Sequence, residues 1–261
     1  MPAPNPVREL VERELLENTP YGLFNDRYEL FEPFAKRPVL AATLDPSTIN
    51  QAAVRLLTGA NKDWIISGTN AANAGSALNV DGGVKLDTAG ADDDQIILSP
   101  ASAINSIAQS PWRAVEWEPE HEVRFAALIE LPSVADVLVH VGLGLTAALD
   151  LTTDADQAKF QFSTEGSTST SNWTAATSIG GTDDETATDE APEASKTIRL
   201  EVRTSSSRVP RFYINGLKVH TGSALTAGAN LIPFLGIQAL AGSAKSILVR
   251  GIRCSRVLNA A

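Results

Sequence analysis

The residues with the best spacing for chemistry lie in the segment WRAVEWEPEHE, residues 112–122. On a continuous strand, side chains two positions apart share one face. Four glutamates have this spacing: Glu116, Glu118, Glu120 and Glu122. Two neighbouring carboxylates can serve a glycoside hydrolase as nucleophile and general acid. However, Pro119 cannot donate to a strand ladder, and four close carboxylates repel one another. The segment is the best catalytic candidate, but the pattern favours an exposed edge between a strand and a loop.

A second candidate is a run of three aspartates, residues 92–94, just before the apolar segment QIIL. Carboxylate oxygens are ligands of Ca²⁺, so such a loop could hold this ion. The run lacks the Asp-x-Asp-x-Asp-Gly spacing of a dedicated calcium loop, which favours a solvated turn. Exposed tryptophans could stack on sugar rings, although packing in the core or at its rim is favoured in a sandwich of this size. The candidates for a glycan or cation site are Asp92, Asp93, Asp94, Trp112, Trp117 and Trp173.

Nucleophiles and bases are scarce in the rest of the chain. The single cysteine, Cys254, excludes an intrachain disulfide and a multi-cysteine metal site, and we interpret it as a small buried residue. His140 lies in the apolar run VLVHVGLGL and is interpreted as a core or sheet-face residue. No Gly-x-Ser-x-Gly, phosphate-loop or His-Glu-x-x-His motif is present. We therefore expect no enzyme, no catalytic residue, no metal and no cofactor, with Ca²⁺ at the aspartates as the alternative.

Charge and hydropathy exclude further classes of protein. The 261 residues carry a net charge of −10, which argues against broad nucleic-acid binding. The sequence contains no run of about 18 apolar residues, so we expect no membrane span, and the first residues lack the pattern of a signal peptide. Six arginines nevertheless gather in the last third of the chain, where they would face an acidic partner or simply be solvated. They are Arg203, Arg208, Arg211, Arg250, Arg253 and Arg256.

Residues 1–60 carry the helical signals. Asn5 and Asp45 each cap an amphipathic segment that begins with proline. Between these segments, residues 21–40 are rich in aromatic side chains and interrupted by prolines. This stretch cannot form a core alone, so it is either a strap over its own domain or an arm that docks on neighbouring subunits. If it is an arm, its interface anchors are Tyr21, Phe24, Tyr28, Phe31 and Phe34.

From residue 61 onward the hydrophobic period changes to two, which is typical of strands. Asp-Gly-Gly after Val80 and Asn-Gly after Ile214 supply the positive φ angles of two tight hairpins. Residues 164–195 are rich in small and acidic residues, which indicates a long solvated loop, or else a loop that binds a cation or a partner. Further strands are expected at residues 95–98, 123–131, 137–145, 158–163, 197–204, 211–214, 217–220, 234–240 and 246–255. Many short strands with almost no helix among them predict an all-β sandwich or jelly roll and exclude a parallel α/β fold.

Four segments within residues 62–258 carry a resemblance to a known fold family. They are GGVKLDTAGADDDQIILSP (82–100), WRAVEWEPEHEVRFAALIEL (112–131), PRFYINGLKV (210–219) and SILVRGIRCSRV (246–257). Together they resemble concanavalin A-like lectin/glucanase jelly-roll domains, in the version found in virion proteins of tailed bacteriophages. Enzymes of this superfamily that resemble laminarinases carry Glu-x-Asp-x-x-Glu on a strand, and this motif is absent here. The metal ligands of legume-type lectins have no counterpart that can be mapped onto the chain. The resemblance implies a binding or structural module and carries over no catalytic residue.

We expect an arm with two short helices at residues 1–60 and a jelly-roll domain at residues 61–261. The resemblance implies a capsid decoration (cement) protein on the outer surface of a phage head, where it stabilises contacts between major capsid subunits. Its partners would be the major capsid protein and further copies of itself, as in a trimer, with no nucleic acid and no membrane. The alternatives are a lectin-like module that binds a glycan, a tail-associated receptor-binding protein and, last, a glycoside hydrolase.

Overall fold

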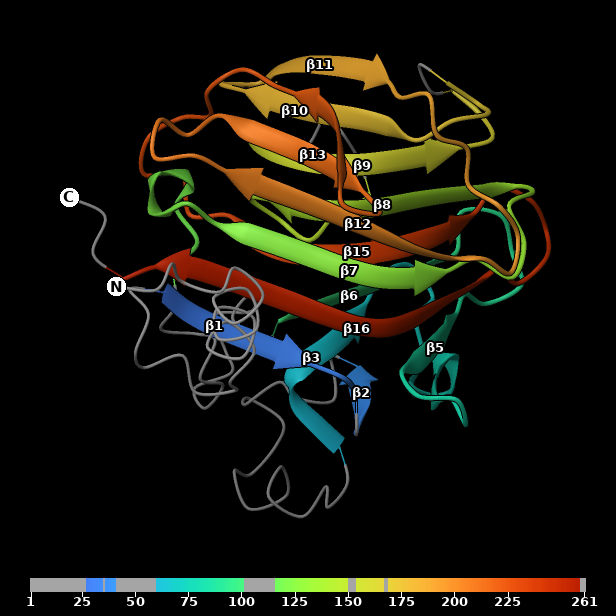
Figure 1. Ribbon diagram of the computed structural model, residues 1–261. Coiled ribbons are helices and arrows are strands. Elements are labelled where there is room, and N and C mark those ends of the chain that lie inside the picture. The colour runs from blue at the N-terminus through green and yellow to red at the C-terminus, as the bar shows by residue number, and fades with distance from the viewer. Residues whose placement is uncertain are drawn as a thin grey trace, which may run out of the picture.

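Two eight-stranded sheets pack face to face in the computed structural model (Figure 1). The structure describes residues 27–34, 36–40, 60–100, 116–149, 154–166 and 169–258. Within these ranges the helical pieces are two 3₁₀ turns, Asn73–Gly75 and Pro119–His121, and no helix is long and apolar enough to cross a membrane. The predicted β-sandwich is therefore confirmed. Both expected N-terminal helices, together with Tyr21, Phe24 and Trp112, lie outside the described residues.

The first sheet, sheet A, is built around one long C-terminal strand. Its strands are β14 (Leu217–Thr221), β13 (Pro210–Ile214), β12 (Thr197–Thr204), β7 (Arg124–Glu130), β16 (Ser246–Val257), β5 (Val84–Asp87), β4 (Ser76–Leu78) and β1 (Arg27–Glu32). Along one side β16 pairs with β7. Along its other side the first part of β16 pairs with β5 and the last part pairs with β1. This strand therefore ties the first described element to the middle of the chain.

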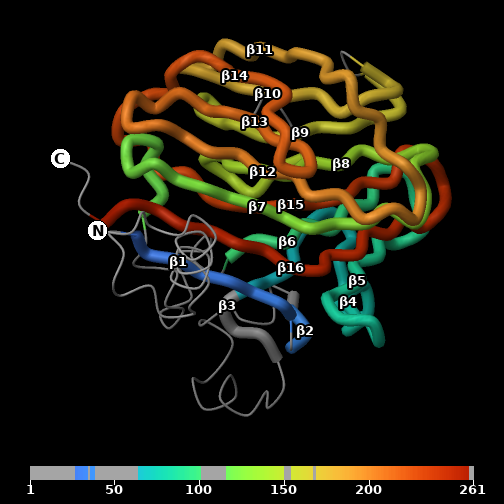
Figure 2. The backbone as a smooth tube through the Cα atoms, in the orientation of Figure 1, coloured from blue at the N-terminus to red at the C-terminus, as the bar shows by residue number. Residues whose placement is uncertain are grey.

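The second sheet, sheet B, lies behind sheet A in the view of Figure 1. Its strands, in spatial order, are β11 (Thr182–Ala187), β10 (Thr174–Ile179), β9 (Asp156–Ser163), β8 (Val137–Gly144), β15 (Ile232–Ala239), β6 (Gln95–Pro100), β3 (Ala60–Ser67) and β2 (Arg37–Leu40). Neighbouring strands are antiparallel except for β2 and β3, which are parallel. Figure 2 shows that β11 lies at the edge of the sandwich opposite to β1 and β2.

The core lies between the sheets and is formed by alternate residues of each strand. In β8, Val137, Val139 and Val141 are fully buried, which is the period of two that the sequence shows. Aromatic rings join the two sheets, because Phe160 of β9 meets Phe212 of β13 edge-to-face at 5.3 Å. Cys254 is buried in this core, as expected.

Trp117 and Trp173 are also core residues, with 1% and 0% of their surface exposed. Trp173 packs edge-to-face on Phe160, with 6.4 Å between the ring centres. Core packing of these tryptophans is thus confirmed. Because neither ring reaches the surface, neither can stack on a sugar, and their place among the glycan-site candidates is wrong.

The sandwich includes strands from before residue 60, which corrects the expected domain boundary. β1 pairs with β16 over six residues, and β2 pairs with β3. Phe34 lies in the core, where its ring meets Trp64 at 6.1 Å. Residues 27–34 and 36–40 therefore form part of the sandwich, as a strap would, and the boundary at residue 60 does not separate an arm from the sheets.

The acidic stretch 164–195 contains a hairpin rather than one long loop. β10 and β11 pair through six registered positions and are joined by Gly180 and Gly181, whose φ angles are +57° and +81°. Two glycines with positive φ form the kind of two-residue turn that connects antiparallel strands. The prediction of a loop was wrong because small and acidic side chains hide the period of two. The two predicted hairpins, β4–β5 and β13–β14, are confirmed.

Candidate binding face on sheet A

The four glutamates of residues 116–122 do not form a carboxylate pair, because this segment is not a strand. It consists of extended residues and the 3₁₀ turn, followed by Glu122 with a φ of +49°. Glu118 contacts His121 at 3.8 Å, and Glu120 accepts a hydrogen bond from the backbone N–H of Gly228 at 2.8 Å. Glu122 instead faces Arg27 at 3.7 Å. The carboxylates of Glu118, Glu120 and Glu122 thus support three different local contacts at the end of the sandwich.

The three aspartates before β6 are likewise committed to separate protein donors. Asp94 is buried and accepts hydrogen bonds from the side chain of Asn70 and the backbone N–H of Ala91, both at 2.6 Å. Asp93 accepts one from Gln238 at 2.7 Å, and the exposed Asp92 accepts one from the backbone N–H of Asp93 at 3.2 Å. Their oxygens therefore do not converge on one point. Among the described residues, no group of three or more His, Cys, Asp or Glu side chains is arranged to hold a metal ion.

The outer face of sheet B contains buried polar groups. His140 of β8 lies opposite Gln161 of β9, and Lys159 is fully buried one row away with its ammonium 5.6 Å from the ring centre of Phe234. Burial and the charge of Lys159 hold the pKa of His140 well below its usual range, so the imidazole is neutral. Burial likewise raises the pKa of the Cys254 thiol, which makes it a poor nucleophile.

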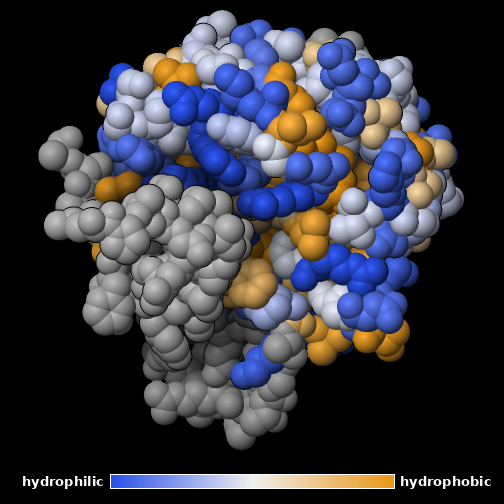
Figure 3. Space-filling view, viewed as in Figure 1, coloured by the Kyte–Doolittle hydropathy of each residue, from blue (hydrophilic) through white to orange (hydrophobic). Residues whose placement is uncertain are grey.

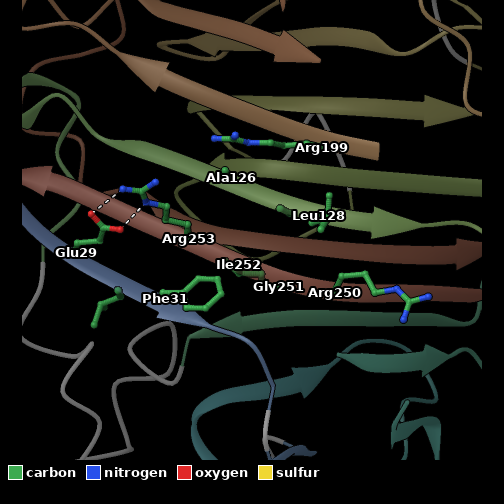
Figure 4. Close-up of a pocket in the computed structure, with 11 residues that line it drawn as sticks. Glu29, Phe31, Ala126, Leu128, Arg199, Arg250, Gly251, Ile252 and Arg253 are labelled. Atoms are coloured by element: carbon green, nitrogen blue, oxygen red, sulfur yellow. Dashed lines mark hydrogen bonds and ion pairs between the residues drawn. The ribbon is translucent and has the colours of Figure 1, made fainter. Parts of the chain in front are cut away.

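The outer face of sheet A carries a groove of about 670 Å³ where β1, β16 and β7 run side by side (Figure 4). Its floor is low because Gly251 has no side chain, and a Cβ at this position would lie 3.5 Å from the Phe31 ring. Phe31 and Leu128 line it with 65% and 40% of their surface exposed. Large apolar side chains exposed around one hollow are typical of an interaction surface.

Paired arginines hold the rim of this groove in place. Arg253 forms a two-pronged ion pair with Glu29 across β16 and β1 (Figure 4). Arg250 contacts Glu130 at 3.1 Å and also donates to the backbone carbonyls of Asp81 and Gly82. On β12, the Arg199 guanidinium contacts Glu201 at 2.9 Å. Each arginine is held by a charge-assisted hydrogen bond to a glutamate, so the groove combines a fixed polar rim with an apolar floor.

Beside the groove, three arginines lie in register on adjacent strands: Arg124 of β7, Arg203 of β12 and Arg211 of β13, here called the arginine row. Arg203 contacts Glu201 at 2.6 Å and lies over the Tyr213 ring at 4.3 Å. Arg124 and Arg211 are exposed, and neither has an ion pair or side-chain hydrogen bond in the described part of the chain. Like charges directly opposite one another on a sheet are destabilising, so the row favours an external anion.

The effect of this row extends to Arg27 at the start of β1. Burial first, and then the nearby charge of Arg124, lower the pKa of Arg27 to about 10. Arg27 compensates by donating to the backbone carbonyl of Glu122 and to the hydroxyl of Ser255. In Figure 3, strongly hydrophilic residues extend across this face, with apolar residues among them. A basic face is unusual on a chain of net charge −10.

The expected interface anchors that the structure describes differ in how exposed they are. Phe31 is exposed in the groove, whereas Tyr28 is half-buried and packs on Trp117 with 6.5 Å between the rings. Phe34 is 2% exposed and cannot contact a partner, so its assignment as an anchor is wrong. Tyr21 and Phe24 lie outside the described residues.

The sequence reasoning singled out Arg203, Arg211, Arg250 and Arg253 but missed Arg124, Leu128 and the groove. The alternation Arg199, Glu201, Arg203 in β12 was a signal for a charged outer face. The hollow itself depends on β1 lying beside β16, far away in the sequence. Nothing local in either segment indicates that pairing.

Comparisons with known proteins bear on the fold. No protein-family model matches the chain, and no curated protein sequence matches it. A protein of unknown function from Shewanella oneidensis MR-1 superposes with a TM-score of 0.55 and 12% identity, over 99% of this chain and 97% of that one. A β-glucanase of Bacillus licheniformis superposes with a TM-score of 0.52 and 9% identity, over 86% of this chain and 96% of that one. The carbohydrate recognition domain of Emp47p superposes with a TM-score of 0.50 and 7% identity, over 76% of this chain and 90% of that one.

These similarities identify the fold as a concanavalin A-like jelly roll. The fold is shared by glucanases and by carbohydrate-binding domains, so it admits both catalysis and binding without deciding between them. The decision rests on the side chains that this chain presents.

Proposed function

We propose that this chain is a non-catalytic structural protein of a virion, a decoration protein that binds the outer surface of a tailed-phage head. The sequence resemblance supports the virion. The observation that carries binding to another protein is the groove, where Phe31 and Leu128 are exposed between arginines held by Glu29 and Glu130. Apolar anchors inside a polar rim are the usual anatomy of a protein–protein interface.

Purified virions provide the first test. Quantitative mass spectrometry should find on the order of hundreds of copies per particle, because a decoration protein occupies many equivalent sites. A handful of copies at the tail would contradict the proposal and favour a receptor-binding protein.

The groove itself is tested by reattachment of purified protein to particles that lack it. Phe31→Glu and Leu128→Glu should each weaken binding at least about tenfold, since charge would enter an apolar contact. Leu217→Glu is the matched control, because Leu217 is 70% exposed but lies on β14, away from the groove. Equal loss in all three variants, or no loss in any, would count against docking at the groove.

The second candidate is a lectin-like carbohydrate-binding module. It is favoured at the level of the fold, because the carbohydrate recognition domain of Emp47p superposes on this chain. A glycan array, run with and without EDTA, tests it directly. Binding of a glycan by the wild type would support this candidate, and an array without signal would remove it. A glycoside hydrolase is disfavoured because the segment 116–122 is not a strand, and Glu118, Glu120 and Glu122 each contact a different partner.

A further inference from the structure

We propose that copies of this chain associate head-to-tail, with the arginine row of one copy contacting the acidic edge strand β11 of the next. This contact is separate from capsid docking, because none of the arginine row lines the groove. Exposed charges of opposite sign carry the inference. They are Arg124 and Arg211 of the arginine row, and Asp183, Asp184 and Asp189 on β11 or in the loop after it.

The basic set lies on the outer face of sheet A. Arg124 and Arg211 flank Arg203 on neighbouring strands, so their Cα atoms are about 10 Å apart across two strand spacings. Glu201, 4% exposed, is already shared between Arg199 and Arg203 and has little capacity left for the others. Among the residues that the structure describes, Arg124 and Arg211 therefore stay uncompensated.

The acidic set lies on β11 and in the loop after it. Asp183, Asp184 and Asp189 are exposed, and none has an ion pair among the residues that the structure describes. β11 is the last strand of sheet B and pairs only with β10. Charged side chains on an edge strand discourage sheet extension, so we expect contact through side chains rather than through backbone hydrogen bonds.

The two sets lie on different sheets of the sandwich. Figure 1 shows β11 at the upper edge of the rear sheet, whereas the arginine row lies on strands of the front sheet. The row faces outward from sheet A, since Arg211 alternates with the buried residues Pro210 and Phe212. A contact between unlike surfaces of identical chains is heterologous, and it forms a ring where the rotation closes.

Sedimentation velocity of the full chain tests the contact. At about 0.1 mM the wild type should associate, because a contact with a Kd near 10 μM is then populated. The double variants Arg124→Gln/Arg211→Gln and Asp183→Asn/Asp184→Asn should each associate at least about tenfold more weakly. Lys36→Gln/Lys85→Gln is the control, since it removes two exposed or half-exposed cations outside the row. A monomeric wild type, or equal loss in the control, would overturn the proposal.

Mixing the two double variants makes the test specific. One variant keeps the acidic edge and the other keeps the basic row, so a head-to-tail contact predicts a 1:1 complex that does not grow further. No complex on mixing would overturn the contact, even if each variant alone is monomeric. Circular dichroism of each variant checks that the sandwich is intact. Loss of association with retained particle binding would leave the proposed function standing, and the reverse result would reject only that function.

Discussion

Phe31 and Phe34 are three positions apart, yet the fold gives them opposite environments. Phe34 is buried against Trp64, whereas Phe31 is 65% exposed on the outer face of sheet A. Phe34→Ala should therefore lower the free energy of unfolding by about 3–5 kcal/mol, through lost burial and a cavity. Phe31→Ala should change it by less than about 1 kcal/mol. Urea denaturation of both variants measures the contrast, and similar losses would contradict the placement of Phe34 in the core.

His140 makes stability depend on pH. Its pKa is lowered in the folded chain by burial and by Lys159, so the unfolded chain takes up the proton first as the pH falls. Stability from this group is complete above the unfolded pKa of about 6.5 and decreases below it. Between about pH 7.5 and 5.5, the wild type should lose more stability than His140→Gln, by on the order of 1 kcal/mol. Equal losses in urea titrations at the two pH values would show that His140 is protonated without cost.

Among the elements, the β10–β11 hairpin depends on its glycine turn. Gly181 has a φ of +81°, a conformation that β-branched residues adopt only with strain. Gly181→Val should therefore destabilise the chain by about 1–3 kcal/mol and lower the melting temperature. Gly90→Val is the matched control, because Gly90 has open space around it and no positive φ. If Gly90→Val lowers the free energy of unfolding as much as Gly181→Val, the effect does not come from the geometry of the turn.

Local patterns predicted the elements that local physics determines. The Asn215–Gly216 turn and the apolar run of β8 specify a hairpin and a strand without further context. β1 could not be predicted in the same way, since Tyr28 and Leu30 become partly buried only after β16 is in place. The groove depends on that long-range pairing too. The charged residues of the face were therefore recognisable from the sequence, but their arrangement around a hollow was not.

Over the whole molecule, charge is unevenly distributed. The chain has a net charge of −10, yet the outer face of sheet A carries the arginine row and the groove arginines. Asp183, Asp184 and Asp189, which have no ion pair among the described residues, lie instead at the β11 edge. Such a distribution orients approaching molecules before contact and disfavours wrong orientations more than it adds affinity. The two proposed interfaces differ in this respect, because the groove offers apolar contact and the row offers charge.

Salt should therefore separate the two interfaces. Exposed charges are screened beyond about 8 Å at physiological ionic strength and beyond about 3 Å at 1 M salt. Raising NaCl from about 0.15 M to about 1 M should increase the Kd of the head-to-tail contact at least about tenfold, as measured by sedimentation velocity. Particle binding through Phe31 and Leu128 should change by less than about threefold, because burial of apolar surface is not screened. If salt weakened both equally, the groove would be acting mainly through its arginines rather than through its apolar floor.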